Sequence, residues 1–183
     1  MEGEFLGQRD LFEFLLDRPA FASELTLALK FARLRIWPTP DGYFLDEGWG
    51  TTGVFRTVYA TDGTRIFYAR GQHKVSWLPP ITGEAVVVID YHFAPGSGGR
   101  ELIKTAVAGF VKLDNRFLAG ALRMGSTLAQ KKADREASGL TRLFTRVSRA
   151  IEEDPAAVYA KLRGRPGVPP ADLQEFRVRL GLR

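Results

Sequence analysis

The spacing of hydrophobic residues changes from every second residue to a helical period within residues 101–134. From Ile103 to Leu113 every second residue is apolar or small, which predicts a β-strand with one covered face. Asp114 and Asn115 can accept bonds from the first free amides of a helix, and apolar residues then recur along one helical stripe. We therefore predict a last strand followed by a long helix over residues 115–134, which can fold back across the sheet.

The segments before that junction alternate between helical and strand patterns. Residues 9–17 form an amphipathic helix that ends at Arg18-Pro19, and a second helical segment follows. Period-two patterns then predict strands over residues 31–37 and 42–60, the latter broken or bulged near Gly48 to Gly50. A hairpin turn at 61–64 leads into a strand at 65–77, and a further strand follows at 84–94, with loops at 77–82 and 96–99. We therefore predict an antiparallel meander of about six strands.

The C-terminal third is predicted to be helical. Its cleanest apolar stripe runs from Leu140 to Ile151, and we expect the helical region to break near Ser138-Gly139. Asp154-Pro155 is a capping residue followed by a proline suited to the first helical position, which predicts a further short helix. After the linker GRPGVPP, a last amphipathic helix is expected to dock on the body of the protein.

Composition limits the classes of function. A chain of 183 residues is enough for one ordinary domain, and the absence of cysteine excludes disulfides and thiol chemistry. The net charge is +5, which could indicate a nucleic-acid-binding protein. The basic residues, however, alternate with apolar residues of predicted helices, and no nucleic-acid-binding motif accompanies them. We expect solvated helix faces and no nucleic-acid partner, while transient contact with an anionic membrane surface stays open. No signal segment or membrane span is evident, so the expected location is cytoplasmic, with export open if a signal was trimmed.

The order of helices, antiparallel meander and long final helix resembles the START-like or helix-grip superfamily, which includes polyketide cyclase and Bet v 1-like proteins. The stretches GWGTTGVFRTVYA, ARGQHKVSWLPPITGEAVVVIDY and VKLDNRFLAGAL carry the resemblance, which covers roughly residues 9–151. It implies an α+β fold in which a curved antiparallel sheet wraps a long helix around an apolar cavity for lipids, sterols or polyketides. The chain departs from that pattern by its extra helices after residue 137. We expect a START-like domain over residues 1–165 and a docked helix over 166–183.

One face of the predicted sheet lacks clustered charge, and we take it as the inward face. Its aromatic residues and its small residues, such as Ala69, Gly71 and Gly109, leave two alternatives open, a ligand cavity and a filled core. If there is a cavity, the resemblance adds two positions from the long helix. The predicted ligand-binding residues are Phe55, Tyr59, Phe67, His73, Trp77, Ile89, Tyr91, Phe93, Val107, Val111, Leu118 and Leu122.

Catalytic chemistry has little support in the sequence. His73 and His92 are predicted on opposite sheet faces, which argues against a joint metal site, and Asp90 beside His92 is typical of a surface contact. We therefore predict no catalytic residue, no metal and no cofactor. The leading hypothesis is a non-catalytic carrier of a hydrophobic molecule such as a lipid or sterol.

Three further hypotheses stay open at this point. The first is a cyclase or dehydratase that uses His73 or Tyr59 as acid or base. The second is an interaction module that uses basic helices, with Arg142 and Arg146 as contacts. The third adds membrane contact to the carrier hypothesis, through basic residues of the long helix that attract anionic lipid. Those basic residues are Arg116, Arg123, Lys131 and Lys132.

Overall fold

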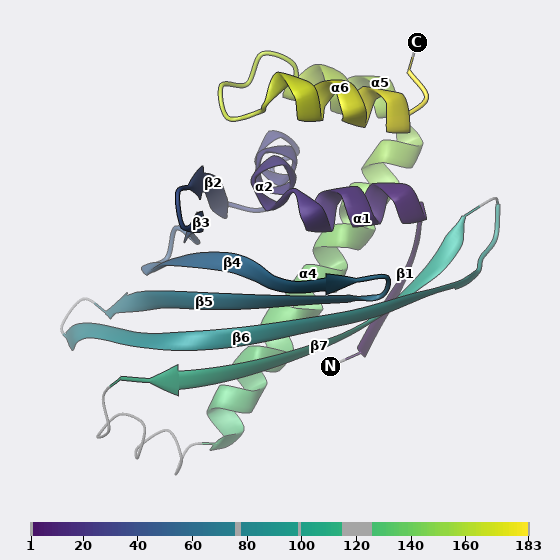
Figure 1. The fold of residues 1–183 in the computed structure, drawn as a ribbon. Coiled ribbons are helices and arrows are strands. Elements are labelled where there is room, and N and C mark those ends of the chain that lie inside the picture. The colour runs from purple at the N-terminus through teal and green to yellow at the C-terminus, as the bar shows by residue number, and fades with distance from the viewer. Residues whose placement is uncertain (1, 76–77, 99, 115–125, 183) are drawn as a thin grey trace.

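The chain combines an open, seven-stranded antiparallel sheet with helices, an α+β architecture (Figure 1). The computed structural model describes residues 2–75, 78–98, 100–114 and 126–182, with side chains left out at 75, 78 and 126–138. The strands are β1 (Glu2–Gly7), β2 (Arg35–Thr39), β3 (Gly42–Asp46), β4 (Thr51–Thr61), β5 (Thr64–Val75), β6 (Leu78–Pro95) and β7 (Glu101–Leu113). The described helices are α1 (Arg9–Asp17), α2 (Pro19–Ala28), α4 (Ser126–Glu153), α5 (Pro155–Leu162) and α6 (Pro170–Arg179).

The strand order is β1-β7-β6-β5-β4-β3-β2, so β2 to β7 form the expected meander and β1 adds a seventh strand at one edge. The prediction of about six strands missed β1. This strand pairs with β7 from Glu2 opposite Ala106 to Gly7 opposite Glu101. Its stabilising partner lies about a hundred residues away, so the local pattern of this short segment carries little strand signal.

Residues 42–60 form two strands, not the single bulged strand expected from the sequence. β3 and β4 pair antiparallel with each other, from Tyr43 opposite Phe55 to Asp46 opposite Thr52. The reversal between them places Gly48 and Gly50 at φ values of 80° and 103°, a region that glycine adopts at little cost. The glycines that suggested a bulge therefore form a turn.

The prediction of a loop at residues 77–82 is also wrong in part, because β6 begins at Leu78. His73 pairs with Ile81, and the register then shifts before Val75 pairs with Leu78. Pro79 and Pro80 lie within this irregular end of the strand. Prolines lack an amide hydrogen, and irregular or edge positions are where a sheet tolerates them.

The helix α4 runs without a break from Ser126 to Glu153, so the break predicted near Ser138-Gly139 does not occur (Figure 1). A single glycine costs roughly 1 kcal/mol in a helix, and the packed stripe that follows it outweighs this cost. Residues 115–125, where the helix was expected to begin, lie outside the described residues. Among the described helices none is long and apolar enough to cross a membrane.

Several local predictions are confirmed. Thr61 pairs with Thr64 across a tight hairpin turn in which Gly63 has a φ of 101°. The Asp154 carboxylate accepts a 2.8 Å hydrogen bond from the Ala157 amide and caps α5, which starts at Pro155. These elements rest on residues within a few positions of one another, which is why the sequence reveals them.

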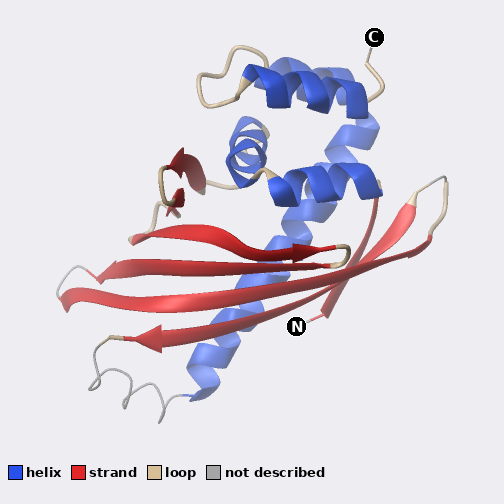
Figure 2. Cartoon of the chain, in the orientation of Figure 1, coloured by secondary structure: helices blue, strands red, loops and turns tan. Residues whose placement is uncertain are grey.

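The first hydrophobic core joins α1 and α2 to the C-terminal helices, which lie above the sheet in Figure 2. Phe21 and Leu25 of α2, Leu162 of α5 and Phe176 of α6 are fully buried in it. Phe176 stacks on Phe14 at 6.0 Å and lies 5.0 Å from Phe21, measured between ring centroids. The last helix therefore docks on the body, as its apolar stripe predicted.

The second core joins one face of the sheet to α1 and the C-terminal half of α4. Phe12 of α1 contacts Tyr91 and Phe93 of β6 and Phe144 of α4, with ring centroids 5.0 to 6.3 Å apart. Ile103 of β7 is fully buried beside them. The helix α1 supplies side chains to both cores and holds the helical layer on the sheet.

Tyr91 is a buried residue whose hydroxyl has no hydrogen-bond partner at normal distance among the described residues. Burial raises the pKa of its phenol, while the Arg65 guanidinium and a weak contact from the Gly63 amide oppose this rise. The neutral phenol therefore contributes stability below the unfolded pKa of about 10, and this contribution is lost as the pH rises through the higher folded pKa.

We expect Tyr91→Phe to change the free energy of unfolding by less than about 1 kcal/mol at pH 7, because no hydrogen bond to a described residue is lost. Above pH 10 the variant should lose less stability than the wild type. Urea unfolding between pH 7 and 11 measures both effects. A loss above about 2 kcal/mol at pH 7 would show that the hydroxyl does have a partner.

Candidate functional site

The register divides the sheet into an inner face, packed on α1 and α4, and an outer face. The inner face carries Ile89, Tyr91, Ile103 and the residues that alternate with them. On the outer face Arg70, Glu84 and Lys112 align in one row, and Arg56, Asp90 and Lys104 share that face. His73 and His92 lie on opposite faces, as expected, because His73 is level with Thr51 and His92 with Lys104.

Tyr59 is the predicted inner residue that the register contradicts. Thr57 pairs with Phe67, but the next pair is Tyr59 with Ile66. The irregularity at Val58 therefore changes the face on which Tyr59 lies. Its side chain is 54% exposed. Tyr59 therefore lies on the outer face, opposite to the face that carries His73.

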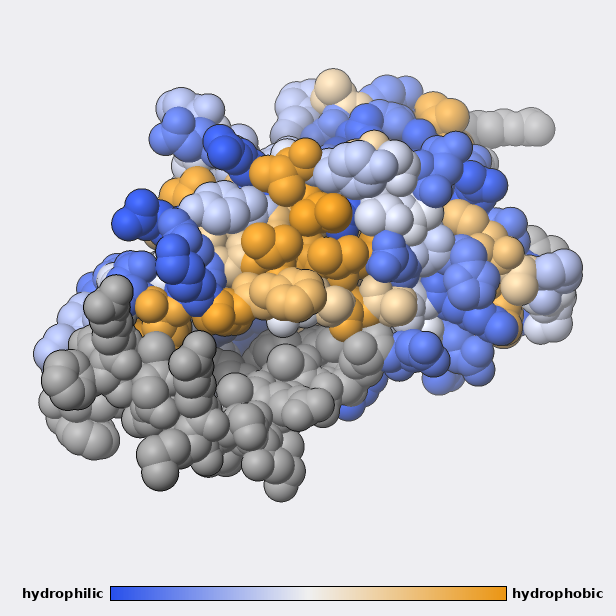
Figure 3. Space-filling model, turned by 60° about the horizontal axis from the view of Figure 1, so that its bottom comes forward, coloured by the Kyte–Doolittle hydropathy of each residue, from blue (hydrophilic) through white to orange (hydrophobic). Residues whose placement is uncertain are grey.

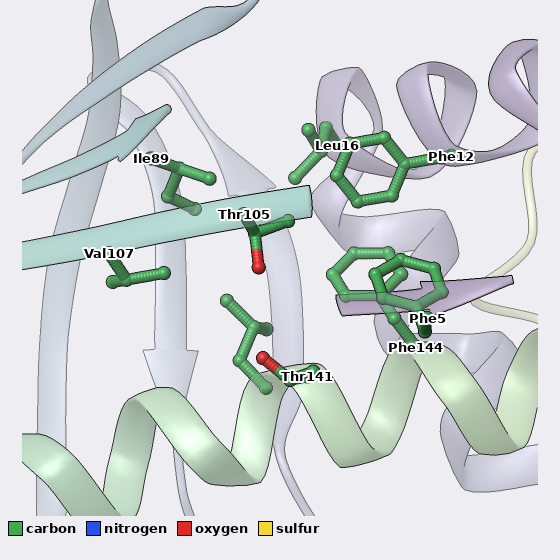
Figure 4. Close-up of a pocket in the computed structure, with 9 residues that line it drawn as sticks. Phe5, Phe12, Leu16, Ile89, Thr105, Val107, Thr141 and Phe144 are labelled. Atoms are coloured by element: carbon green, nitrogen blue, oxygen red, sulfur yellow. The ribbon is translucent and has the colours of Figure 1, made fainter. Parts of the chain in front are cut away.

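The inner face is filled where α1 and α4 cover it. A cavity of about 10 Å³ lies there between the sheet, α1 and α4, about the space of one water molecule. Figure 4 shows Phe5, Phe12 and Phe144 gathered at one end of it, and Ile89 and Val107 at the other. At this position the filled-core alternative holds, since aromatic side chains occupy the space.

Beyond this covered region the inner face continues along β4 to β7 with apolar side chains that are only partly buried. Phe55, Phe67 and Val87 are half-buried, and Val111 is 71% exposed. Gly109 is level with Val87, and no atom of the described part of the chain lies within 4 Å of the place where its side chain would begin. The structure thus presents an accessible apolar surface that adjoins a core but is not filled by it.

A row of glycines crosses this accessible part of the inner face. Gly53, Gly71 and Gly83 are level with one another on β4, β5 and β6. A Cβ on Gly71 would lie 2.6 Å from the Thr52 carbonyl oxygen, so the close approach of the strands requires glycine there. Because glycine has no side chain, no side chain projects from this row, which lies between Phe55 and Ala69 on one side and His73 on the other.

His73 ends the inner face on β5 and takes part in a hydrogen-bond chain with two residues near the β3-β4 turn. Its Nδ1 lies 2.9 Å from the Thr51 hydroxyl, which donates a 2.5 Å hydrogen bond to the Glu47 carboxylate. All three side chains are half-buried. Sequence analysis named His73 but missed its partners, because the reversal at residues 47–50 that brings Glu47 close was interpreted as a bulge.

Arg65 is a second polar residue on the inner face that sequence analysis missed. It is level with Ile89, and its guanidinium donates to both carboxylate oxygens of Asp17 at 2.7 and 3.2 Å. It also donates to the Thr61 and Thr64 carbonyls. The hydrogen bond to Asp17 raises the pKa of Arg65 above its ordinary value. The pair fixes the end of α1 on the sheet.

A larger open groove of about 760 Å³ lies between α2, the β2-β3 hairpin and the segment 165–170. Trp37, stacked on Phe44 at 4.8 Å, is its exposed aromatic residue. Ion pairs of 2.8 Å between Arg165 and Glu24 and of 3.1 Å between Arg18 and Asp172 tie its walls together. The groove is mixed in polarity, and these ion pairs engage four of its charged side chains within the protein, while Arg35 also lines it.

The outer face also carries apolar side chains. Phe110, 65% exposed, aligns with Val86, and Val88 aligns with Ala108. Figure 3 shows hydrophobic side chains gathered at the centre of the view with hydrophilic side chains on both sides. This face also carries polar contacts between strands, since the Tyr68 hydroxyl donates a 2.9 Å hydrogen bond to Glu84 and Lys112 lies 3.6 Å from the Glu84 carboxylate.

Some predicted positions are outside the described residues, and their placement stays a prediction. They include the site residues Trp77, Leu118 and Leu122. The side chains of the basic residues proposed for membrane contact, Arg116, Arg123, Lys131 and Lys132, also lie outside. Of the basic residues on described helices, Arg146 lies 4.0 Å from the ring centroid of Phe31, and Arg142 is exposed.

In the described part of the chain, no group of three or more histidine, cysteine, aspartate or glutamate residues is placed to hold a metal ion. Comparison with protein-family models, with curated protein sequences and with solved structures returned no match.

Proposed function

We propose that the protein is a non-catalytic carrier that binds a hydrophobic small molecule, such as a lipid or sterol, against the inner face of the sheet. The observation that carries the proposal is the continuation of this apolar face beyond the filled core, where Phe55, Phe67 and Val87 are half-buried and Val111 is exposed. Burial of such surface by an apolar ligand stabilises a complex by about 25 cal/mol per Å².

The order of elements supports the same proposal. Two helices, an antiparallel meander and a long final helix make up the order for which the sequence resembles the START-like superfamily. In proteins of that kind the ligand lies between the sheet and the last helix. Here α4 passes behind the strands, and the far ends of β4, β5 and β6 extend past it (Figure 1). The accessible inner face lies on this part of the sheet.

Gly109 provides a direct test. A Gly109→Phe substitution should leave the fold intact, because no described residue lies within 4 Å of the new Cβ and phenylalanine favours strands more than glycine does. The new ring should occupy the proposed ligand surface and lower the affinity for a fluorescent fatty acid or sterol at least tenfold. Fluorescence titration measures the affinity, and thermal unfolding checks the fold.

Ala108→Phe is the matched control, since Ala108 is exposed on the same strand but faces outward, level with Val88. It adds a ring to the same strand without entering the proposed surface, so its affinity should equal that of the wild type. Equal affinity in both variants, or no saturable uptake by the wild type together with no lipid-like molecule in the purified protein, would contradict the proposal.

A further inference from the structure

The hydrogen-bond chain of Glu47, Thr51 and His73 fixes the proton on one side of the histidine ring. A threonine hydroxyl has one hydrogen to donate, and a carboxylate only accepts. Because Thr51 donates to the Glu47 carboxylate, it accepts at its contact with His73, so the hydrogen-bond pattern assigns the ring proton to Nδ1. In the neutral ring Nε2 then carries a lone pair and is an acceptor.

The backbone holds this chain in place. The Glu47 amide donates to the Thr51 carbonyl at 3.1 Å, and the Lys74 amide donates to the Gly50 carbonyl at 2.9 Å. The β3-β4 turn is thus bonded to β5 next to His73. The tautomer is therefore set by a formed turn and does not depend on a free side chain finding a partner.

His73 lies at the apolar ligand surface with its second nitrogen unused. It shares the inner face with the glycine row and is level with Ile81 on β6. Among the described residues Nε2 has no hydrogen-bond partner, whereas Nδ1 has one. An apolar ligand that covers this part of the face would bury that acceptor, and a buried acceptor without a donor costs about 1–3 kcal/mol.

We propose that the ligand is an apolar molecule that carries a hydroxyl group, an alcohol or a phenol, and that this hydroxyl donates a hydrogen bond to Nε2 of His73. This inference rests on the proposed function and specifies its ligand class. A carboxylate is disfavoured because it has no hydrogen to donate and because Glu47 places a negative charge at the other end of the chain. Charged groups nearby do not reverse this preference. Arg33 is engaged with the Trp49 ring at 5.4 Å, and Lys74 follows His73 on the opposite face.

Three probes with one ring system test the proposal, namely 2-naphthol, 2-methylnaphthalene and 2-naphthoate. We expect the wild type to bind 2-naphthol about tenfold more tightly than the other two, in calorimetric or fluorescence titrations. His73→Leu replaces the imidazole with an apolar side chain and should remove the preference for 2-naphthol while 2-methylnaphthalene binds as before.

Variants of Thr51 test whether the preference for 2-naphthol depends on the tautomer of His73, because they retain the histidine itself. Thr51→Val keeps the shape but removes the hydroxyl, so the preference for 2-naphthol should fall, whereas Thr51→Ser should retain it. The ¹⁵N shifts of the His73 ring report the tautomer directly and should show a proton on Nδ1 in the wild type and in Thr51→Ser only.

The outcomes distinguish this inference from the proposed function. Binding of 2-methylnaphthalene and 2-naphthol with equal affinity, unchanged by His73→Leu, would overturn the hydroxyl inference and leave the carrier function standing. Tightest binding of 2-naphthoate would overturn it as well, in favour of an anion. If none of the three probes binds and fatty acid and sterol probes also fail, both proposals fall.

Discussion

We expect Phe176→Ala to lower the free energy of unfolding by about 3–5 kcal/mol, as large-to-small changes of buried aromatic residues do. Phe176 is fully buried and is in ring contact with Phe14 of α1 and Phe21 of α2. The substitution therefore opens a cavity where α6 meets the first two helices. Urea unfolding monitored by circular dichroism measures the loss.

Val178→Ala is the matched control on the same helix, because Val178 is 67% exposed. We expect it to change stability by less than about 0.5 kcal/mol. If both variants lose equal stability, or if Phe176→Ala is nearly neutral, α6 does not pack on the body as described. A lower unfolding cooperativity in Phe176→Ala would indicate that α6 detaches before the rest unfolds.

The second large effect is expected at the ion pair of Asp17 and Arg65. The Arg65 side chain is 10% exposed and Asp17 is 46% exposed, so the two partners differ in how well water can replace the interaction. Asp17→Ala leaves a nearly buried guanidinium without its bidentate partner, and we expect a loss of about 2–3 kcal/mol, below the range for a fully buried pair.

Arg65→Met should cost less, about 1 kcal/mol, because the half-exposed Asp17 can be hydrated and methionine fills the space beside Tyr91. The order of the two losses is the test, measured in the same urea titrations. A greater loss in Arg65→Met than in Asp17→Ala would show that the hydrogen bonds from Arg65 to the Thr61 and Thr64 carbonyls matter more than the carboxylate.

The features that the sequence predicted well depend on short-range periodicity. The alternation along β6 and β7 placed Ile89, Tyr91, Phe93 and Val107 on one face, and the register confirms it. The helical stripe from Leu140 to Ile151 correctly indicated the buried side of α4, where Val147 and Ile151 are in the helical core. Both patterns are averages over many residues, so one atypical residue does not obscure them.

The errors arise where one residue decides the geometry. The irregularity at Val58 reverses the face of Tyr59, and a strand pattern cannot reveal it because both faces of β4 carry mixed residues. Glycine at 48 and 50 is compatible with a bulge and with a turn, and only the pairing of β3 with β4 decides between them. Gly139 resembled a break in the helix, but the adjacent packing decides otherwise.

The polar part of the candidate site was the least predictable. Arg65 lies within a strand next to apolar residues, and its burial depends on Asp17, which is 48 positions away in the chain. The contact between Thr51 and His73 joins residues 22 positions apart and requires the register of two strands. The chemistry of such pairs is absent from local patterns, because it exists only after the sheet has formed.

The pairing of β1 with β7 determines when the protein can fold during synthesis. Thr105 bonds to the Gly3 carbonyl across 102 residues, and Arg18 bonds to Asp172 across 154. Contacts of this separation form slowly, because a long loop must close before they contribute. The first strand and the first two helices emerge from the ribosome long before their partners, with Phe12, Phe14 and Phe21 still uncovered. The nascent chain therefore exposes these aromatic side chains until the segments that cover them have been synthesised.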